Sequence, residues 1–290
     1  MPRKLGRSKV QLMTHRRLSH SRTIPKGSVL WGLLILSLFV ASPARVVADP
    51  TPAAVSAFNN YIGTIESRLA VRHRSENGFL AGAASGPQID TRLRRGELIV
   101  ERLTPSAGVV MPGAMLHHWR GTAFAPGAKA ADFELLMRNF NAYPQHFAPQ
   151  VLQAKTLSQQ DDHFQASMRV RQRHVITVVM DTTYDITFGR LDARHGYSAS
   201  RSTRIAEIDS PGTRRERALN SNEEHGFLWR LYTYWNYEER DGGLYMQIES
   251  VSLTRAIPTG LGWAIGPFVE SVPRESLEFT LRSTCNALRR

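Results

Sequence analysis

A few residues of this sequence could do chemistry, and their spacing limits which chemistry is open to them. His117 and His118 could hold a metal ion, but neighbouring side chains of a strand point to opposite faces of a sheet. The pair therefore cannot chelate one ion, and no HExxH motif accompanies it. Cys285 is the only cysteine, which excludes a disulfide scaffold and a cysteine-clustered metal site. We expect no metal site.

Motifs for cofactor binding and nucleophilic catalysis are also missing from the sequence. Gly260, Gly262 and Gly266 resemble a dinucleotide loop, but the last spacing is one residue too long and no strand–helix–strand unit surrounds them. We expect these glycines to form a tight turn before a final helix. There is no G-x-S-x-G motif, and Cys285 fits a small buried residue better than a nucleophile. We expect no cofactor and assign no catalytic residue.

Arg201 is a charged residue that period-two alternation places on an apolar face. It shares parity with Tyr197 and Ile205, and Glu249 lies in a strand near it in the expected sheet order. A buried charge needs a partner, since burying it alone is very costly. Two interpretations stay open: Arg201 binds a polar or anionic headgroup, or it pairs internally with Glu249. A parity slip at a bulge would instead move Arg201 to the other face.

The charge of the chain is concentrated at one end. The 290 residues hold 37 Lys and Arg against 25 Asp and Glu, a formal charge of +12. Nine of the basic residues and none of the acidic ones lie in residues 1–48, so the rest of the chain is close to neutral. A nucleic-acid-binding surface is therefore not expected. A basic loop with Arg214, Arg215 and Arg217 leaves open a peripheral contact with an acidic membrane surface.

Residues 1–48 have the pattern of a secretory signal. A basic stretch precedes an apolar run of 12 residues, 29–40, which is short for a membrane span of roughly 20 residues. Pro43 follows, and small residues precede Ala48. We expect cleavage after Ala48 and a periplasmic or secreted protein. An uncleaved, membrane-anchored form is the alternative.

The remaining residues divide into an extension, 49–110, and a main domain, 111–290. The extension holds an amphipathic helix over 53–74, a loop over 79–87 and a strand over 97–103. In the main domain, turn residues separate a series of strands, and Asp241-Gly242-Gly243 predicts a tight hairpin. The elements expected there are a strand at 115–124, helices at 130–140 and 145–148, strands at 151–157, 163–173, 175–190, 197–208, 227–239 and 244–257, and a helix at 273–289.

Consecutive strands with short turns require an antiparallel sheet, and the last helix carries an apolar stripe that can cover one face. The fold class is therefore α+β: a curved antiparallel sheet around a long C-terminal helix, with an N-terminal helical extension. Alternation places Phe227, Trp229, Leu231, Trp235 and Tyr237 on the face toward that helix, where large aromatic residues tend to leave an apolar cavity. The candidate cavity residues are Met180, Tyr184, Arg201, Trp229, Trp235, Tyr237 and Met246.

With this element order, the chain resembles the START / Bet v 1-like (SRPBCC) superfamily and its helix-grip fold. The similarity covers about residues 115–290. It rests on residues 131–133 and 143–147, on the strand at 175–184, and on residues 257–265 before the closing helix. The branch it is most similar to is that of polyketide cyclases and coenzyme Q-binding-like proteins. Such a resemblance implies an apolar ligand but transfers no catalytic motif.

Three functional hypotheses follow. The first is an exported, non-enzymatic binding protein for an apolar small molecule, such as a lipid, quinone or polyketide-like compound. The second is a cyclase- or aromatase-like enzyme on the same fold, which requires convergent acid and base groups around an open pocket. The third is a structural or partner-binding protein of the cell envelope, which requires a broad exposed apolar stripe on the 53–74 helix. The oligomeric state does not follow from the sequence.

Overall fold

A computed structural model describes residues 49–74, 79–80, 87–104, 109–173, 177–257 and 262–289, which belong to one compact unit of the chain. The predicted signal segment, residues 1–48 with the cleavage site after Ala48, lies outside the described residues. Most of the predicted loop at 79–87 and residues 258–261 lie outside them too. Among the described helices, none combines the length and the apolar character needed to cross a membrane.

Within the described residues, the sheet has ten strands, and every pairing between them is antiparallel. Its main path, from one edge to the other, is β1 (Ile99–Arg102), β3 (Ala114–Pro126), β10 (Gly243–Arg255), β9 (Arg230–Arg240), β7 (His195–Asp209), β6 (Thr177–Arg190), β5 (His163–Arg173) and β4 (Val151–Gln160). Two short strands join this path: β2 (Val109–Met111) pairs with β3, and β8 (Arg217–Ala218) pairs with β7.

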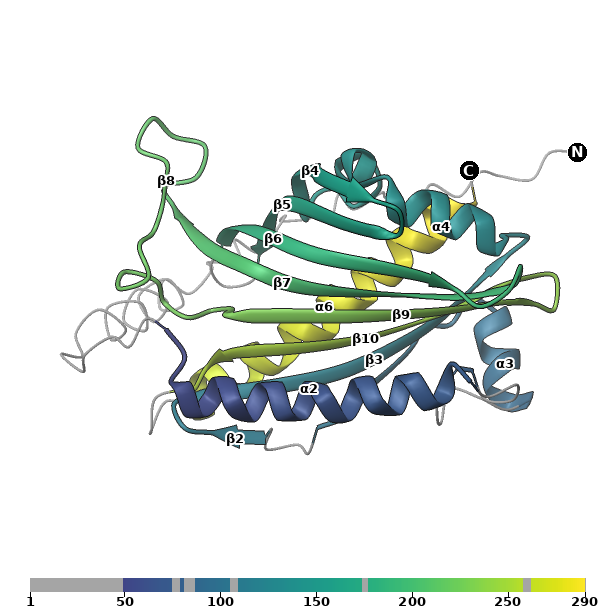
Figure 1. Ribbon diagram of the computed structural model, residues 1–290. Helices are drawn as coiled ribbons and strands as arrows, with labels where there is room; N and C mark the ends of the chain where they lie inside the picture. Colours follow the sequence, from purple (N-terminus) through teal and green to yellow (C-terminus); the bar gives the residue numbers. More distant parts are fainter. Residues whose placement is uncertain are drawn as a thin grey trace, which may run out of the picture. The chain divides into compact units, whose positions relative to one another are not determined.

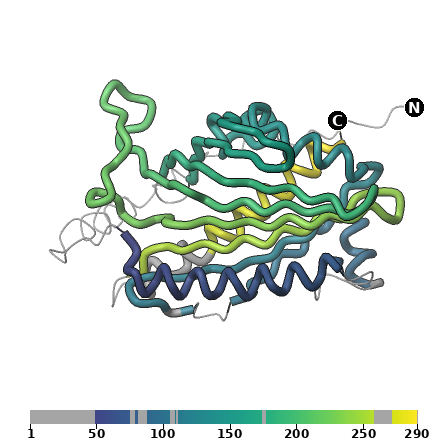
Figure 2. Tube along the Cα trace, viewed as in Figure 1, coloured from purple at the N-terminus to yellow at the C-terminus, as the bar shows by residue number. Residues whose placement is uncertain are grey.

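Helices cover both faces of this sheet (Figure 1). The long C-terminal helix α6 (Gly262–Leu288) packs on the face that we call the inner face, together with α4 (Ala130–Arg138). Helix α2 (Pro52–Arg72) packs on the opposite, outer face (Figure 2). The remaining helices are short: α3 (Pro87–Arg94), η2 (Phe140–Ala142) and α5 (Tyr143–His146). The predicted α+β class, a C-terminal helix gripped by an antiparallel sheet with a helix N-terminal to it, is confirmed.

Helix α2 matches the amphipathic helix predicted over 53–74. Thr51 caps its N-terminus by accepting a hydrogen bond from the Ala54 backbone N–H at 3.1 Å, and Pro52 occupies the first turn, where no N–H is needed. The stripe of apolar side chains is buried against β2, β3, β9 and β10. Its buried members are Ala54, Phe58, Ile62, Ile65 and Leu69.

The hairpin between β9 and β10 forms where it is predicted. Asp241 and Gly242 have φ values of 55° and 73°, the left-handed conformations that a tight two-residue hairpin turn requires. Strands β9 and β10 then pair in register from Arg240 opposite Gly243 to Arg230 opposite Leu253. This pairing fixes which side chains of the two strands face α6 and which face α2.

The start of the C-terminal helix differs from its prediction. We expected it to begin at Pro273, but α6 already begins at Gly262 and passes through Gly266 and Pro273. Proline has a helical φ, so a helix can continue through it at the cost of one hydrogen bond. Gly262 and Gly266 are therefore helical residues, and the tight turn expected of the three glycines is wrong for these two.

The large apolar residues predicted to share one face of the strand at 227–239 do not all lie on that face. Trp235 and Tyr237 face α6, but Trp229 packs in the cluster under α2, and Phe227 is 37% exposed. Strand β9 begins only at Arg230, so the alternation does not extend back to residues 227 and 229. Helix α2 also buries the face that carries Asn236, which we expected to be the solvent-facing side of this strand.

Candidate functional site

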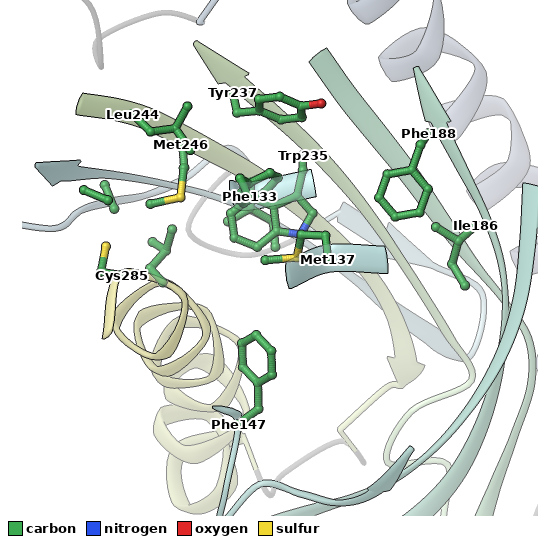
Figure 3. Packing of buried hydrophobic residues seen from close by; sticks show 14 of the residues in the cluster. Phe133, Met137, Phe147, Ile186, Phe188, Trp235, Tyr237, Leu244, Met246 and Cys285 are labelled. Carbon is green, nitrogen blue, oxygen red and sulfur yellow. The ribbon is translucent and has the colours of Figure 1, made fainter. Parts of the chain in front are cut away.

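The candidate site is a cluster of buried side chains between the inner face of the sheet and α6, which we call the inner cluster. Four of the seven predicted cavity residues belong to it: Tyr184, Trp235, Tyr237 and Met246. Figure 3 shows Trp235, Tyr237 and Met246 with side chains from α4 and α6. The cluster contains Trp119, Ala123, Ala125, Ala128, Ala130, Phe133, Met137, Phe140, Phe147, Phe164, Ala166, Tyr184, Ile186, Phe188, Trp235, Tyr237, Leu244, Met246, Ile248, Leu277, Leu281 and Cys285.

Gly121 on β3 lets α6 approach the sheet closely. A Cβ atom at this position would lie 2.6 Å from Leu281 Cδ1 and 3.1 Å from Leu277 Cγ. The missing side chain thus makes room for two leucines of the predicted apolar stripe, Leu277 and Leu281, which are buried as expected. Cys285, one turn further on, is buried as well, so it is placed as a small core residue.

Helix α4 contributes one aromatic ring, Phe133, and one thioether, Met137, to the inner cluster. The Phe133 ring centroid lies 5.3 Å from that of Trp235 and 4.7 Å from that of Tyr237. Met137 follows one turn later and belongs to the same cluster (Figure 3). Aromatic edges and flexible thioethers can adapt to an apolar molecule without fixed polar contacts. No site residue was predicted in this helix, although Phe133 and Met137 have the i, i+4 spacing of a buried helix face.

Met180 is buried on β6 but lies outside the inner cluster. Two other predicted cavity residues lie on the outer face. Trp229 packs in the cluster under α2. Arg201 donates from Nε and Nη2 to Glu66 Oε1 of α2, at 2.9 and 2.6 Å. The placement of Arg201 and Trp229 in an inner cavity is therefore wrong.

A bulge in β7 explains the misplacement of Arg201. The register between β6 and β7 shifts between Thr183 and Tyr184, which adds one residue to β7. Paired residues of neighbouring strands share a face, and Arg201 pairs with Asp185 whereas Ile205 pairs with Thr182. Arg201 and Ile205 therefore lie on opposite faces, as the alternative of a parity slip predicted.

Glu249 has partners other than Arg201. Its carboxylate is fully buried on the outer face, where Oε2 accepts from Arg68 Nη2 at 2.5 Å and lies 2.9 Å from His118 Nε2. The guanidinium groups of Arg72 and Arg120 lie 3.6 and 3.8 Å from Oε1. The internal Arg201–Glu249 pair is thus wrong: α2 supplies the opposite charge to each of these residues.

Burial by itself would raise the pKa of Glu249, but the hydrogen bond from His118 and the charge of Arg68 outweigh it and lower the pKa to about 2.

His118 has a second partner besides Glu249. The other side of the His118 ring faces Tyr61, whose hydroxyl lies 2.9 Å from Nδ1. His117 precedes His118 on β3, and the Nε2 atom of His117 lies 3.3 Å from the Thr254 hydroxyl of the neighbouring strand β10. The two histidines have separate partners, and no group of three or more metal-ligating side chains occurs among the described residues.

Two surface hollows stand out in the described part of the chain, and of the inner cluster only Ala128 lines either of them. The larger has a volume of about 510 Å³ and is lined by Ala131, Glu134, Leu135, Arg138, Asp162 and Arg190. The smaller, of about 320 Å³, lies at the β9–β10 hairpin and the loop before α4. The described members of the inner cluster are almost without exposed surface. These residues are packed as a core, and neither hollow is the apolar cavity that was expected from the sequence.

One carboxylate links the larger hollow to the inner cluster. Glu134 accepts a hydrogen bond from the Tyr237 hydroxyl at 2.6 Å and is paired with Arg190 through both oxygens. Burial opposes ionisation of Glu134, but hydrogen bonds from Arg190 and Tyr237 outweigh it and lower its pKa. Burial and the bond to Glu134 raise the pKa of Tyr237, so the phenol stays protonated and donates.

No family model and no curated protein matches this chain. Among solved structures, it is similar to a STAR-related lipid transfer protein from Xanthomonas axonopodis, with 17% identity, a TM-score of 0.40, and coverage of 61% of this chain and 94% of that chain. It is also similar to a START superfamily protein from Mycobacterium smegmatis (13%, TM-score 0.39, 59% and 97% covered). A third is the Zhui aromatase/cyclase from Streptomyces sp. R1128 (13%, TM-score 0.41, 60% and 94% covered).

Proposed function

We propose that this chain, which has a helix-grip fold, is an exported, non-enzymatic binding protein for an apolar small molecule such as a lipid, a quinone or a polyketide-like compound. The observation that carries the proposal is the make-up of the inner cluster, in which aromatic and methionine side chains from α4 and five strands meet beneath α6. Apolar surfaces with few, specifically placed polar groups are typical of small-molecule sites.

The chemistry of the inner cluster favours binding over catalysis. Its ionisable groups include Tyr184 and Tyr237, and burial raises the pKa of both phenols, so neither serves as a base near neutral pH. The nearby carboxylate of Glu134 is already occupied by Tyr237 and Arg190. A cyclase- or aromatase-like enzyme would need a free acid or base beside the bound molecule, and turnover of an added polyketide-like substrate would support that alternative instead.

The third hypothesis, a partner-binding protein that docks through the 53–74 helix, required an exposed apolar stripe. The stripe of α2 is instead buried on the chain's own sheet, with Phe58 edge-on to Tyr232 at 5.2 Å between ring centroids. The requirement of this alternative hypothesis is therefore not met by the 53–74 helix. Helix α2 stabilises the outer face of the sheet.

The binding proposal is tested by extracting the protein, purified from its native host, with organic solvent and analysing the extract by mass spectrometry. We expect one class of apolar molecule in about equimolar amount, because a buried apolar ligand survives aqueous purification. The matched control is a Trp235→Ala variant purified in the same way, which should retain less of it. An extract without any such molecule, together with no binding of apolar probes by the folded protein, would contradict the proposal.

Export is proposed from the sequence of residues 1–48, with cleavage after Ala48. The mass of the mature protein tests it, and we expect a chain that begins at Asp49. Replacing Leu34 with Arg in the apolar run should block export, whereas Leu5→Arg, outside that run, should not. A mature chain that keeps residues 1–48 in the membrane fraction would instead show the anchored form.

A further inference from the structure

We infer that the larger hollow, beside α4, is an entrance through which an apolar molecule reaches the inner cluster, and that two ion pairs hold it closed. This inference rests on the proposed binding function. The hollow is about 510 Å³ in volume and is lined by Ala131, Glu134, Leu135, Arg138, Asp162 and Arg190. Leu135, from the exposed side of α4, gives it an apolar contact at the surface.

A single layer of side chains separates the hollow from the inner cluster. Glu134 lines the hollow and accepts the hydrogen bond of Tyr237, which is buried within the cluster. Arg138 also lines the hollow, and its guanidinium carbon lies 4.4 Å from the ring centroid of Phe188 and 5.7 Å from that of Phe164. Both rings belong to the inner cluster. Turning these two polar side chains aside would expose Tyr237, Phe188 and Phe164 to the hollow.

Each of the two ion pairs that keep this layer in place has one solvent-exposed partner. Arg138 Nη2 donates to Asp162 Oδ1 at 2.7 Å, and the Asp162 side chain is 63% exposed. Arg190, the partner of Glu134, has a side chain that is 58% exposed. The Arg138–Asp162 pair is therefore screened by salt and can open and close readily. The Glu134–Arg190 pair is the firmer of the two, because Glu134 is buried and bonds Arg190 through both oxygens.

Helix α4 is itself a short cover of the inner cluster. It spans only Ala130–Arg138, yet it inserts Phe133 and Met137 into the inner cluster (Figure 3). An outward movement of this helix would withdraw both side chains and vacate apolar volume. Helix α2, by contrast, covers the outer face and does not bound this route.

The inference is tested by plugging the hollow. Ala131→Cys places a thiol on the exposed wall of the hollow, and Ser67→Cys places one on the exposed side of α2 as a matched control. Both folded variants are labelled with a bulky maleimide, since native Cys285 is buried and burial raises the pKa of its thiol. Stopped-flow fluorescence then follows the uptake of the neutral apolar probe N-phenyl-1-naphthylamine.

We expect the label at residue 131 to slow association by about fivefold or more, because an entrance is blocked, and the label at residue 67 to leave it unchanged. Equal association rates for the two labelled proteins would overturn the entrance while leaving the binding function standing. If the unlabelled parent protein takes up no probe, the proposed function itself fails and the entrance with it.

A second pair of variants tests the ion pairs. Asp162→Asn removes the partner of Arg138, and Asp185→Asn removes a half-exposed carboxylate of the outer face. We expect Asp162→Asn to raise the association and dissociation rates by about the same factor, roughly threefold, with little change in affinity, because it destabilises only the closed layer. Rates for Asp162→Asn that equal those for Asp185→Asn would overturn the closing role of the ion pair.

Discussion

The Glu249 carboxylate of β10 is fully buried and accepts a hydrogen bond at 2.5 Å from Arg68 of α2, a residue 181 positions earlier in the chain. His118 of β3 binds the same oxygen, and Arg72 and Arg120 lie within 4 Å of the other. Because α2 carries two of the positive charges, the helix and the buried carboxylate depend on each other. The outer face is therefore a second core that contains an ionic network.

Glu249→Gln should destabilise the protein strongly. The substitution leaves three guanidinium groups close together without their buried negative partner, and the loss of one member of a buried charge network costs about 3–5 kcal/mol. Urea denaturation at neutral pH measures the change. The control is Glu97→Gln, which removes a half-exposed partner of Arg92 and should leave the midpoint where it is. Equal midpoints for the two variants would contradict a central role of Glu249.

The same carboxylate should make stability depend on pH in acid. Its pKa is about 2 in the folded protein, below the usual 4.5, so the folded state favours the ionised form. The stabilisation, about 3 kcal/mol, is complete above the unfolded pKa and is lost as the pH falls from about 5 toward 2. Urea denaturation across this range should show the parent and Glu249→Gln converging. A difference that stays constant down to pH 2 would contradict the shift.

Two glycines should respond to alanine in opposite directions. At Gly121, a Cβ would meet Leu281 and Leu277 of α6 at 2.6 and 3.1 Å, so Gly121→Ala should cost about 1–3 kcal/mol through overpacking. At Gly63, on the exposed side of α2, a Cβ meets nothing within 4 Å, so Gly63→Ala should stabilise by up to about 1 kcal/mol. Thermal unfolding checks both signs. A neutral Gly121→Ala would mean that α6 does not approach the sheet this closely.

The two buried tryptophans of this region should separate stability from binding. Trp235→Ala removes a large ring from the inner cluster and Trp229→Ala removes one from under α2, and each should cost on the order of 3–5 kcal/mol. Only Trp235→Ala should weaken the binding of N-phenyl-1-naphthylamine, measured under conditions in which both variants are folded. Equal loss of binding in the two variants would place the ligand outside the inner cluster.

Much of the architecture could be predicted because local patterns and tertiary packing agree. The strand at 163–173 was predicted with the bounds that the structure gives, and the Asp241-Gly242 turn joins the expected strands. Alternation also placed Trp235 and Tyr237 correctly, since β9 is regular there.

The errors arose where a long-range contact decides the outcome. Arg201 was misplaced because one extra residue in β7 reverses the parity, and a bulge leaves no clear mark in the sequence. Asn236 and Glu249 are buried because α2 covers them, and no local pattern joins a helix to strands so distant in the chain. The polar residues Glu66, Arg68 and Arg72, interleaved with an apolar helix stripe, were the available signal.

Photo-crosslinking tests most directly the claim that an apolar molecule binds between the sheet and α6. The folded protein is irradiated with a diazirine-bearing fatty acid and digested, and the labelled peptides are identified by mass spectrometry. The account predicts labels on peptides that contain inner-cluster residues such as Met137, Tyr184 or Met246, and their loss when the protein is first unfolded. Labels confined to exposed apolar residues such as Val71 and Leu157, or no labelling of the folded protein, would contradict it.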